Sequence, residues 1–436
     1  MSHLSCASLA ICYLLCICTM CSAGPIPIEE VAHLTLSVGR LLLASGADTA
    51  EVQDSMTRFA EGYGCEAHLL VGYEALLLTV VAGEQFRTKV GYRVPAMNVN
   101  MSAVAAVNQL VGEVEEARCG LADARKELEN IEHKSPAYGR WAVVIALGLT
   151  AASLARLFGS DWPTFWVSWL AGSIGMWLRQ VLGRHEFNLF FIPFAAALVS
   201  GVIGGAAVLL GVSATPALCL VAPGMIIVPG VPLVNAVQDM IKNHMTVGIA
   251  RLGLGGLVTL AIAFGLYVAT VITGAKIPVD APQQLLSVPE DALFSALAAL
   301  GYLFLFNVPA RIAWAGVVCG VASHTLRTLC LHLRIDIVTG TLLGALVVGF
   351  LAQGFARQFR APAVAFAFPG IVAMVPGAFA FRAFIGVLQI VQTGTAAATA
   401  LMTETLALTV TCVLMVAAIA VGVAAPLILI KRGTAL

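Results

Sequence analysis

Long apolar segments follow one another from Trp141 almost to the C-terminus and leave few folds open to this chain. A helix needs roughly 20 apolar residues to cross a bilayer, and about ten segments have that length. Only 11% of the 436 residues are charged, whereas soluble domains carry about 25%. The sequence therefore predicts a polytopic α-helical membrane protein. The segments lie near 141–158, 162–180, 189–211, 215–239, 246–273, 289–307, 310–330, 335–356, 363–390 and 398–430.

Proline and glycine recur at matching places in the fourth and ninth segments, at an offset of about 147 residues. Each half holds five segments. Because five is an odd number of spans, the second half starts on the opposite side of the membrane and is inverted relative to the first. The sequence thus predicts two inverted five-helix repeats, 141–275 and 289–430, joined by a linker over 276–288. Paired broken helices in inverted repeats are typical of secondary transporters, with the substrate bound at the breaks. The matching residues are Pro216, Pro223-Gly224 and Pro229-Gly230 in one segment, and Pro362, Pro369-Gly370 and Pro376-Gly377 in the other.

Most charged residues lie in residues 27–140, ahead of the first apolar segment. Helical and strand patterns alternate there, which predicts a small soluble α+β domain of about a hundred residues. Asp48 follows a Ser-Gly-Ala break and is a suitable N-cap for the second helix. The expected elements are helices over 28–45 and 49–62, strands over 66–72, 75–81 and 84–90, and one helix over 98–132 that ends before Pro136.

The two ends of the chain differ in character. Residues 1–26 are apolar and hold five cysteines within the first 21 positions. This leader lacks the basic segment that opens a signal peptide, so a signal, an anchor and a start-site artefact all stay open. Residues 431–436 form a short basic tail.

Lysine and arginine are distributed unevenly between the two sides that this topology defines. Eleven fall on the side of the soluble domain and four on the opposite side. Cytoplasmic loops carry the excess of positive charge, so we predict a multi-pass protein of the plasma or inner membrane with the soluble domain and both termini in the cytoplasm. The eleven are Lys126, Lys134, Arg140, Arg179, Arg184, Lys242, Arg311, Arg357, Arg360, Lys431 and Arg432, and the four are Arg156, Lys276, Arg327 and Arg334.

The substrate site is expected at the two breaks, with Pro229, Gly230, Pro376 and Gly377 as its backbone. Asn235 and Arg382 each follow a break proline by six residues and are candidates for binding the substrate. A charged side chain inside an apolar span costs free energy and needs a partner or a function. The alternative for Arg382 is a structural ion pair or a position at the membrane interface.

Two carboxyl groups are candidates for carrying a proton. Asp239 lies near the end of its span, where a solvated acid is the alternative, and Glu404 is alone in the last segment, where pairing with a neighbouring helix is the alternative. The histidines at span ends, His185, His324 and His332, are expected at the membrane interface.

The sequence lacks the residue patterns that other classes of function require. Formal net charge is zero, which argues against nucleic acid, and the 11 cysteines form no zinc pattern with histidine. No nucleophile elbow appears and no phosphate loop follows a strand, so we expect no enzyme, no metal and no cofactor. A membrane-embedded enzyme or peptidase with a catalytic soluble domain, and a passive channel, stay open as alternatives.

Several motifs resemble the threonine/serine exporter family, whose two-chain relatives export dicarboxylates such as succinate. The resemblance implies a secondary transporter that exports threonine, serine or short dicarboxylates, driven by the proton motive force. Its partners would be a small-molecule substrate, protons and the lipid bilayer, and a homo-oligomer stays open. Gln238, Lys242-Asn243-His244 and Leu254 depart from the charges that the family usually has there. The motifs are Ser45-Gly46-Ala47-Asp48-Thr49 with Val52 and Asp54-Ser55-Met56, Arg93-Val94, Ala106-Val107-Asn108, Val228-Pro229-Gly230-Val231-Pro232-Leu233 with Asn235 and Asp239, Gly248 with Ala250-Arg251-Leu252, Phe306-Asn307-Val308-Pro309, Ala361-Pro362-Ala363, Pro369-Gly370-Ile371, and Val375-Pro376-Gly377 with Arg382-Ala383.

Overall fold

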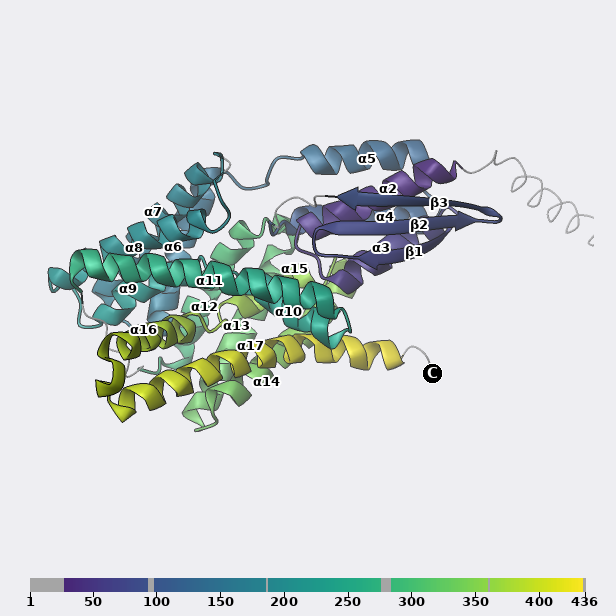
Figure 1. The fold of residues 1–436 in the computed structure, drawn as a ribbon. Helices are drawn as coiled ribbons and strands as arrows, with labels where there is room; N and C mark the ends of the chain where they lie inside the picture. The colour runs from purple at the N-terminus through teal and green to yellow at the C-terminus, as the bar shows by residue number, and fades with distance from the viewer. Residues whose placement is uncertain (1–26, 93–97, 186, 276–283, 360, 434–436) are drawn as a thin grey trace, which may run out of the picture.

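The structure is a computed structural model, and it describes residues 27–92, 98–185, 187–275, 284–359 and 361–433. It has an α+β unit at the N-terminal end and a large helical part (Figure 1). The leader over 1–26, most of the linker and the last three residues of the tail lie outside the described residues.

The N-terminal unit packs four helices with an antiparallel sheet in the order β1-β2-β3. Apolar residues of α2 at helical spacing, among them Val38 and Leu42, are buried with Leu76 and Leu78 of β2. The predicted early helices and the three strands are present to within two residues. The elements are α2 (Ile28–Ala44), α3 (Thr49–Glu61), β1 (Glu66–Val71), β2 (Ala75–Ala82), β3 (Gln85–Tyr92), α4 (Met101–Glu115) and α5 (Leu121–His133).

The single helix predicted over 98–132 is wrong, because the chain forms two helices there. Ala117 has a positive φ of 55°, which ends α4, and Gly120 precedes the first residue of α5. A non-glycine residue in this left-handed conformation cannot continue a helix. Apolar periodicity continues across the break, so the pattern alone did not reveal it.

The helical part consists of two halves with the same order of elements. In each half the fourth apolar segment is split into two helices. The first half holds α6 (Arg140–Leu157), α7 (Trp162–Leu182), α8 (Phe191–Leu209), α9 (Pro216–Met225), α10 (Gly230–Ile241) and α11 (Met245–Thr273). The second holds α12 (Val288–Leu305), α13 (Ala310–His332), α14 (Ile337–Phe359), α15 (Val364–Val372), α16 (Gly377–Thr393), a short turn (Gly394–Ala396) and α17 (Thr399–Gly433).

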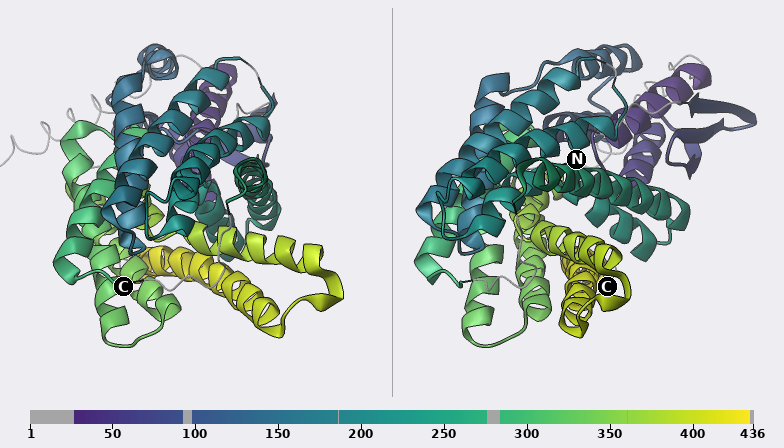
Figure 2. Two further views of the ribbon diagram at one scale, coloured as in Figure 1. Left: turned by 90° about the vertical axis from the view of Figure 1, so that its left-hand side faces the viewer. Right: turned by 60° about the vertical axis from the view of Figure 1, so that its left-hand side comes forward.

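Equivalent helices have equivalent neighbours in the two halves. In the first half α6 packs on α7, α8 on α11 and α10 on α11, and in the second α12 packs on α13, α14 on α17 and α16 on α17. Figure 2 shows the two halves side by side, the first in blue to teal and the second in green to yellow. The shared pattern supports a duplication.

The first helices of the two halves, α6 and α12, pack together and run antiparallel. Tyr138, just before α6, donates a hydrogen bond to the carbonyl of Val308, just after α12. At the other ends, Gly159 after α6 lies against the backbone of Gln284, ahead of α12. This antiparallel pair is what an inverted repeat requires, and the inversion of the whole repeat stays a prediction.

Within the described residues, seven helices are long and apolar enough to span a membrane. Helices α9 and α10 are bent by 63° at their break and make an eighth if the pair counts as one span. The helices α7 and α13 have 21 and 23 residues but are less apolar, because α7 is rich in tryptophan and glycine and α13 carries arginine and histidine. A polytopic helical membrane protein is confirmed, and the number of ten spans stays a prediction. The seven are α6, α8, α11, α12, α14, α16 with its short turn, and α17.

The N-terminal unit contacts one end of the helical part, which we call the domain side; the opposite end is the far side. The described positive residues divide between these sides as the sequence predicted, with Arg140, Arg184 and Arg311 on the domain side, and Arg156 and Arg334 on the far side. The C-terminal end of α17 also lies toward the domain side (Figure 1).

Candidate functional site

Both halves interrupt their fourth segment with the same backbone turn. Helix α9 ends at Met225 and α10 begins at Gly230, while α15 ends at Val372 and α16 begins at Gly377. The amide of Gly230 donates to the carbonyl of Val228 at 2.8 Å, and the amide of Gly377 donates to the carbonyl of Val375 at 2.8 Å. Pro229 and Pro376 have no N–H to continue the ladder, which explains why each helix stops and restarts.

The two breaks face each other. A Cβ added to Gly230 would lie 3.2 Å from Val375, and one added to Gly377 would lie 3.4 Å from Val228. Each glycine therefore packs against the break of the other half, and a void of only about 10 Å³ lies beside Gly377. Irregular backbone at membrane depth is tolerated where it is packed against protein or lines a cavity, and both conditions hold here.

We call the place where the two breaks meet the crossing, and two larger cavities adjoin it. One of about 520 Å³ is almost entirely apolar and is lined by Pro376 and Gly377 together with residues of α9, α10, α11 and α17. The other, of about 280 Å³, is lined by Pro229 and Gly230 and also by Arg179. The four predicted proline and glycine residues thus line cavities of the size that holds a small solute.

Asn235 and Asp239 point to the N-terminal unit. The Asn235 amide nitrogen donates to the carbonyl of Gly46 at 3.0 Å, and the Thr49 amide donates to the Asp239 carboxylate at 3.1 Å. Neither residue lines the two cavities beside the breaks. Helix α10 therefore joins the crossing to the loop between α2 and α3.

A buried ion pair lies at this joint. Arg251 of α11 is 2.9 Å from the Asp239 carboxylate and also donates to the carbonyl of Ala47, and the side chains of the pair are 1% and 0% exposed. The reading of Asp239 as a solvated acid is therefore wrong. Removing one partner of such a pair leaves a buried charge and costs about 3–5 kcal/mol, so the pair ties α10, α11 and the loop together.

Arg382 and Glu404 lie together on α16 and α17, 3.6 Å apart. The Arg382 side chain is 13% exposed and that of Glu404 is 42% exposed. Helix α16 leaves the crossing toward the far side, where Gln392 contacts Tyr267 of α11, whereas α10 leaves it toward the domain side. Asn235 and Arg382 thus lie on opposite sides of the crossing, and neither lines one of the two cavities beside it.

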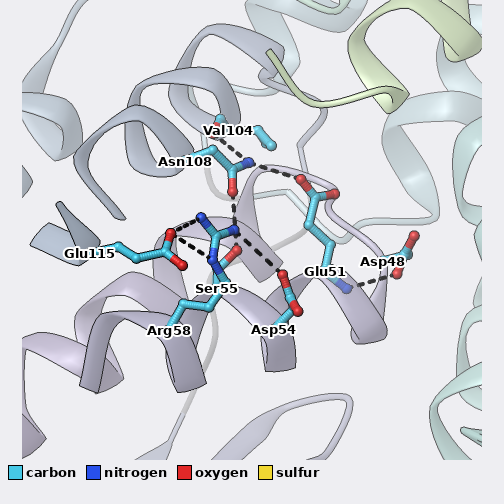
Figure 3. A network of polar contacts seen from close by, with 8 residues as sticks. All are labelled: Asp48, Glu51, Asp54, Ser55, Arg58, Val104, Asn108 and Glu115. Atoms are coloured by element: carbon cyan, nitrogen blue, oxygen red, sulfur yellow. Dashed lines mark hydrogen bonds and ion pairs between the residues drawn. The ribbon is translucent and has the colours of Figure 1, made fainter. Parts of the chain in front are cut away.

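A network of polar side chains lies between α3 and α4 (Figure 3), and it contains Asp54, Ser55 and Asn108 of the motifs that resemble the exporter family. Asn108 donates to the Glu51 carboxyl at 2.9 Å and accepts from Ser55 at 3.1 Å. Arg58 contacts Asp54 and Glu115 at the outer end. Apart from Glu115, these residues line a polar cavity of about 790 Å³ that Lys242, Arg311 and Gln353 border from the helical part.

The pKa values of the two acids nearest the helical part in this cavity are shifted in opposite directions. Burial raises the pKa of Glu51 to about 7, and the neighbouring Asp48 carboxylate adds to the rise, while the bond from Asn108 opposes it. Burial alone would raise the pKa of Asp48 too, but Lys242 at 3.0 Å and the Glu51 amide more than offset it and lower that pKa. Glu51 can thus exchange a proton near neutral pH while Asp48 stays charged.

A second buried charged group lies toward the far side, and it corrects the expectation for one histidine. His324 is 1% exposed and not interfacial; its Nδ1 is 2.8 Å from the Asp291 carboxylate. Arg327 contacts the other ring nitrogen of His324, and Thr328 donates to Asp291 at 2.7 Å. His332, at the end of α13, contacts the carbonyl of Leu286.

Some of these buried charged groups could have been predicted from single residues in the sequence. Arg251 is a lone charge in a 29-residue apolar helix, and His324 and Arg327 share a helix face at a spacing of three. Glu51 offered no such signal, because acids are common in that segment. Its environment depends on Asn108, which is 57 residues away in the chain.

Comparison with known proteins gives consistent matches along the chain. The family described as "Putative threonine/serine exporter" matches residues 33–273, and the one described as "Threonine/Serine exporter, ThrE" matches residues 291–429. A "Probable succinate transporter subunit" of Escherichia coli is 30% identical over 253 residues, 57% of this chain and 96% of that protein. A "Probable threonine/serine exporter" of Mycobacterium tuberculosis is 25% identical over 372 residues, 81% of this chain and 69% of that protein. No solved structure matches the chain.

Proposed function

We propose, because the chain belongs to the threonine/serine exporter family, that it is a secondary transporter that exports threonine, serine or short dicarboxylates from the cytoplasm. The observation that carries this proposal is the crossing of two broken helices, one from each half, with a cavity on either side. A passive channel does not need two broken helices packed on each other. Inverted repeats with their substrate site at such breaks are the common architecture of secondary transporters.

The substrate class follows from what the relatives' names share. One relative is named for succinate and another for threonine and serine. All three compounds are small and carry a carboxylate. We propose that this carboxylate is the group the protein recognises, with Pro229, Gly230, Pro376 and Gly377 forming the path and with Arg382 engaging the substrate on the far side of the crossing. Asn235 would engage the substrate only in a state in which its bond to the Gly46 carbonyl is broken.

Export is proposed to draw on the proton motive force. Asp239 and Glu404 each lie beside an arginine, so protonation of either acid would release its partner. In this proposal residues 27–140 and both termini lie in the cytoplasm, which the positive residues on the domain side support. The protein acts as a transporter without enzymatic chemistry, and an assembly of several copies is compatible with a relative that is named as a subunit.

Counterflow in proteoliposomes tests the function. Vesicles loaded with unlabelled threonine, serine or succinate should accumulate the same labelled compound, and a pH gradient should increase net export. Glu404→Gln should abolish the response to the gradient and leave exchange at equal pH intact. Asp239→Asn should also abolish the response, and its exchange is measured per folded, inserted protein because the variant leaves the buried Arg251 unpaired. Counterflow of none of the three compounds would refute the transport proposal, and unchanged gradient responses in both variants would exclude these acids from coupling.

A further inference from the structure

The 280 Å³ cavity on the domain side extends from the N-terminal unit to the crossing of the breaks. Tyr73 and Asn98 line it at the N-terminal unit, and Gly230 and Val372, one from each break region, line it at the crossing. Its volume is just below the roughly 300–1,000 Å³ of pockets that hold drug-sized ligands, which suits a solute of a few carbon atoms.

Among the described residues that line this cavity, Arg179 is the one with a charged side chain. It lies in the last turn of α7 and is partly buried. Among the residues that the structure describes, no carboxylate lies within ion-pair distance of Arg179. Arg251 and Arg382, in contrast, each have an acid beside them. A partly buried guanidinium without a counter-charge is costly unless an anion from outside supplies one.

The duplication explains where the missing acid would be. Helices α6 and α12 begin 148 residues apart, at 140 and 288, and so do α7 and α13, at 162 and 310. At this offset Arg179 corresponds to Arg327 of the second half. There the arginine contacts His324, which is bound to Asp291. The counterpart of Asp291 in the first half is Val143, so the first half keeps the arginine and lacks its acid.

The backbone around the cavity favours the same kind of ligand. Helix α10 begins at the cavity with Gly230 and Val231, and a helix N-terminus carries partial positive charge. Pro232 has no N–H, and most of the remaining lining is apolar. A carboxylate would find a guanidinium fork and a favourable dipole there, without a competing acid on the lining.

We infer that Arg179 binds the carboxylate of the transported solute in this cavity, so that the cavity is the entry site on the domain side. The inference rests on the proposed transport function and names a different residue from Arg382 for carboxylate binding. The guanidinium would hold both carboxylate oxygens, which the single ammonium of lysine cannot copy.

The test measures the KM for succinate and for L-threonine in counterflow with Arg179→Gln, Arg179→Lys and Arg184→Gln. Arg184 is the matched control, because it is exposed beyond the end of the same helix and does not line the cavity. We expect Arg179→Gln to raise KM at least tenfold, Arg179→Lys to raise it less, and Arg184→Gln to leave it unchanged. If the glutamine variant does not fold, the lysine variant must still raise KM.

Vesicle composition separates a solute carboxylate from a lipid phosphate, the other anion that could reach Arg179. The rise in KM should be the same in neutral phosphatidylcholine vesicles and in vesicles with anionic lipid. An unchanged KM in Arg179→Gln, or a rise in KM that appears only with anionic lipid, would overturn the inference about Arg179. The transport proposal would still stand in that case, provided that the wild type shows counterflow. Absence of wild-type counterflow would overturn both.

Discussion

Single residues of the loop between α2 and α3 determine how the N-terminal unit meets the membrane helices. Gly46 has a φ of 90°, which favours glycine, and its carbonyl accepts from Asn235. Ala47 accepts from Arg251, and the Thr49 amide donates to Asp239. The residues that carry the family motif at 45–49 therefore serve as one side of a joint, and Asn235 and Asp239 are the other.

Glu51 gives a prediction at this scale, because its pKa rises from an ordinary 4.5 to about 7 on folding. A carboxyl group with a raised pKa binds its proton more tightly in the folded state. Its contribution to stability is complete below pH 4.5 and is lost as the pH rises through about 7. We expect the melting temperature of the detergent-solubilised protein to fall over this range, and Glu51→Gln to weaken that fall.

Glu61→Gln is the control for this experiment. It makes the same chemical change at an exposed position of α3 and should keep the wild-type pH dependence. Equal slopes of melting temperature against pH in the wild type and Glu51→Gln would show that the carboxyl group is not held in its neutral form.

At the scale of elements, the two broken segments work as a pair. The glycine of each break lies against valines or methionine of the other break region. Helix α10 connects this crossing to the N-terminal unit, and α16 extends from it toward the far side. Movement at the crossing would therefore reach both sides of the protein through rigid helices.

Gly230→Leu tests the importance of this close contact. A Cβ at this position already approaches Val375 to 3.2 Å and Val372 to 3.6 Å, so a larger side chain must separate the breaks. We expect the initial rate of counterflow, per inserted protein, to fall at least tenfold. Gly253→Leu is the control in the neighbouring helix α11, where no atom lies within 4 Å of an added Cβ. Equal rates in both variants would contradict a role for the contact.

At the scale of the whole molecule, the N-terminal unit is attached to both halves. It contacts α10 and α11 of the first half through the loop at 45–49. It also contacts the loop between α12 and α13, where the amide of Met101 donates to Phe306 and Asn307 donates to Asn100 at 2.8 Å. If one half rocks against the other during transport, at least one of these attachments must loosen.

Side-specific labelling tests the orientation that we propose. Cysteines introduced at Arg184 and Arg311, on the domain side, should be protected from an impermeant thiol reagent in intact cells, relative to the parent chain. Cysteines at Asp336 and Thr395, in exposed far-side loops, should react. Permeabilised cells provide the control, since all four sites should then label. Labelling of the domain-side pair alone in intact cells would reverse the orientation.

The sequence by itself determined the membrane class, the two halves and the positions of the breaks. Apolar length and the proline–glycine pattern are local properties that every residue carries with it along the chain. Tertiary structure alone decided the partners. Asp239 meets Arg251 and Thr49, His324 meets Asp291, and Arg382 meets Glu404, because helix packing brings together positions that are 12 to 190 residues apart. A lone charge in an apolar segment indicates that the charge needs a partner, but the identity of that partner depends on which helix packs against the charged residue.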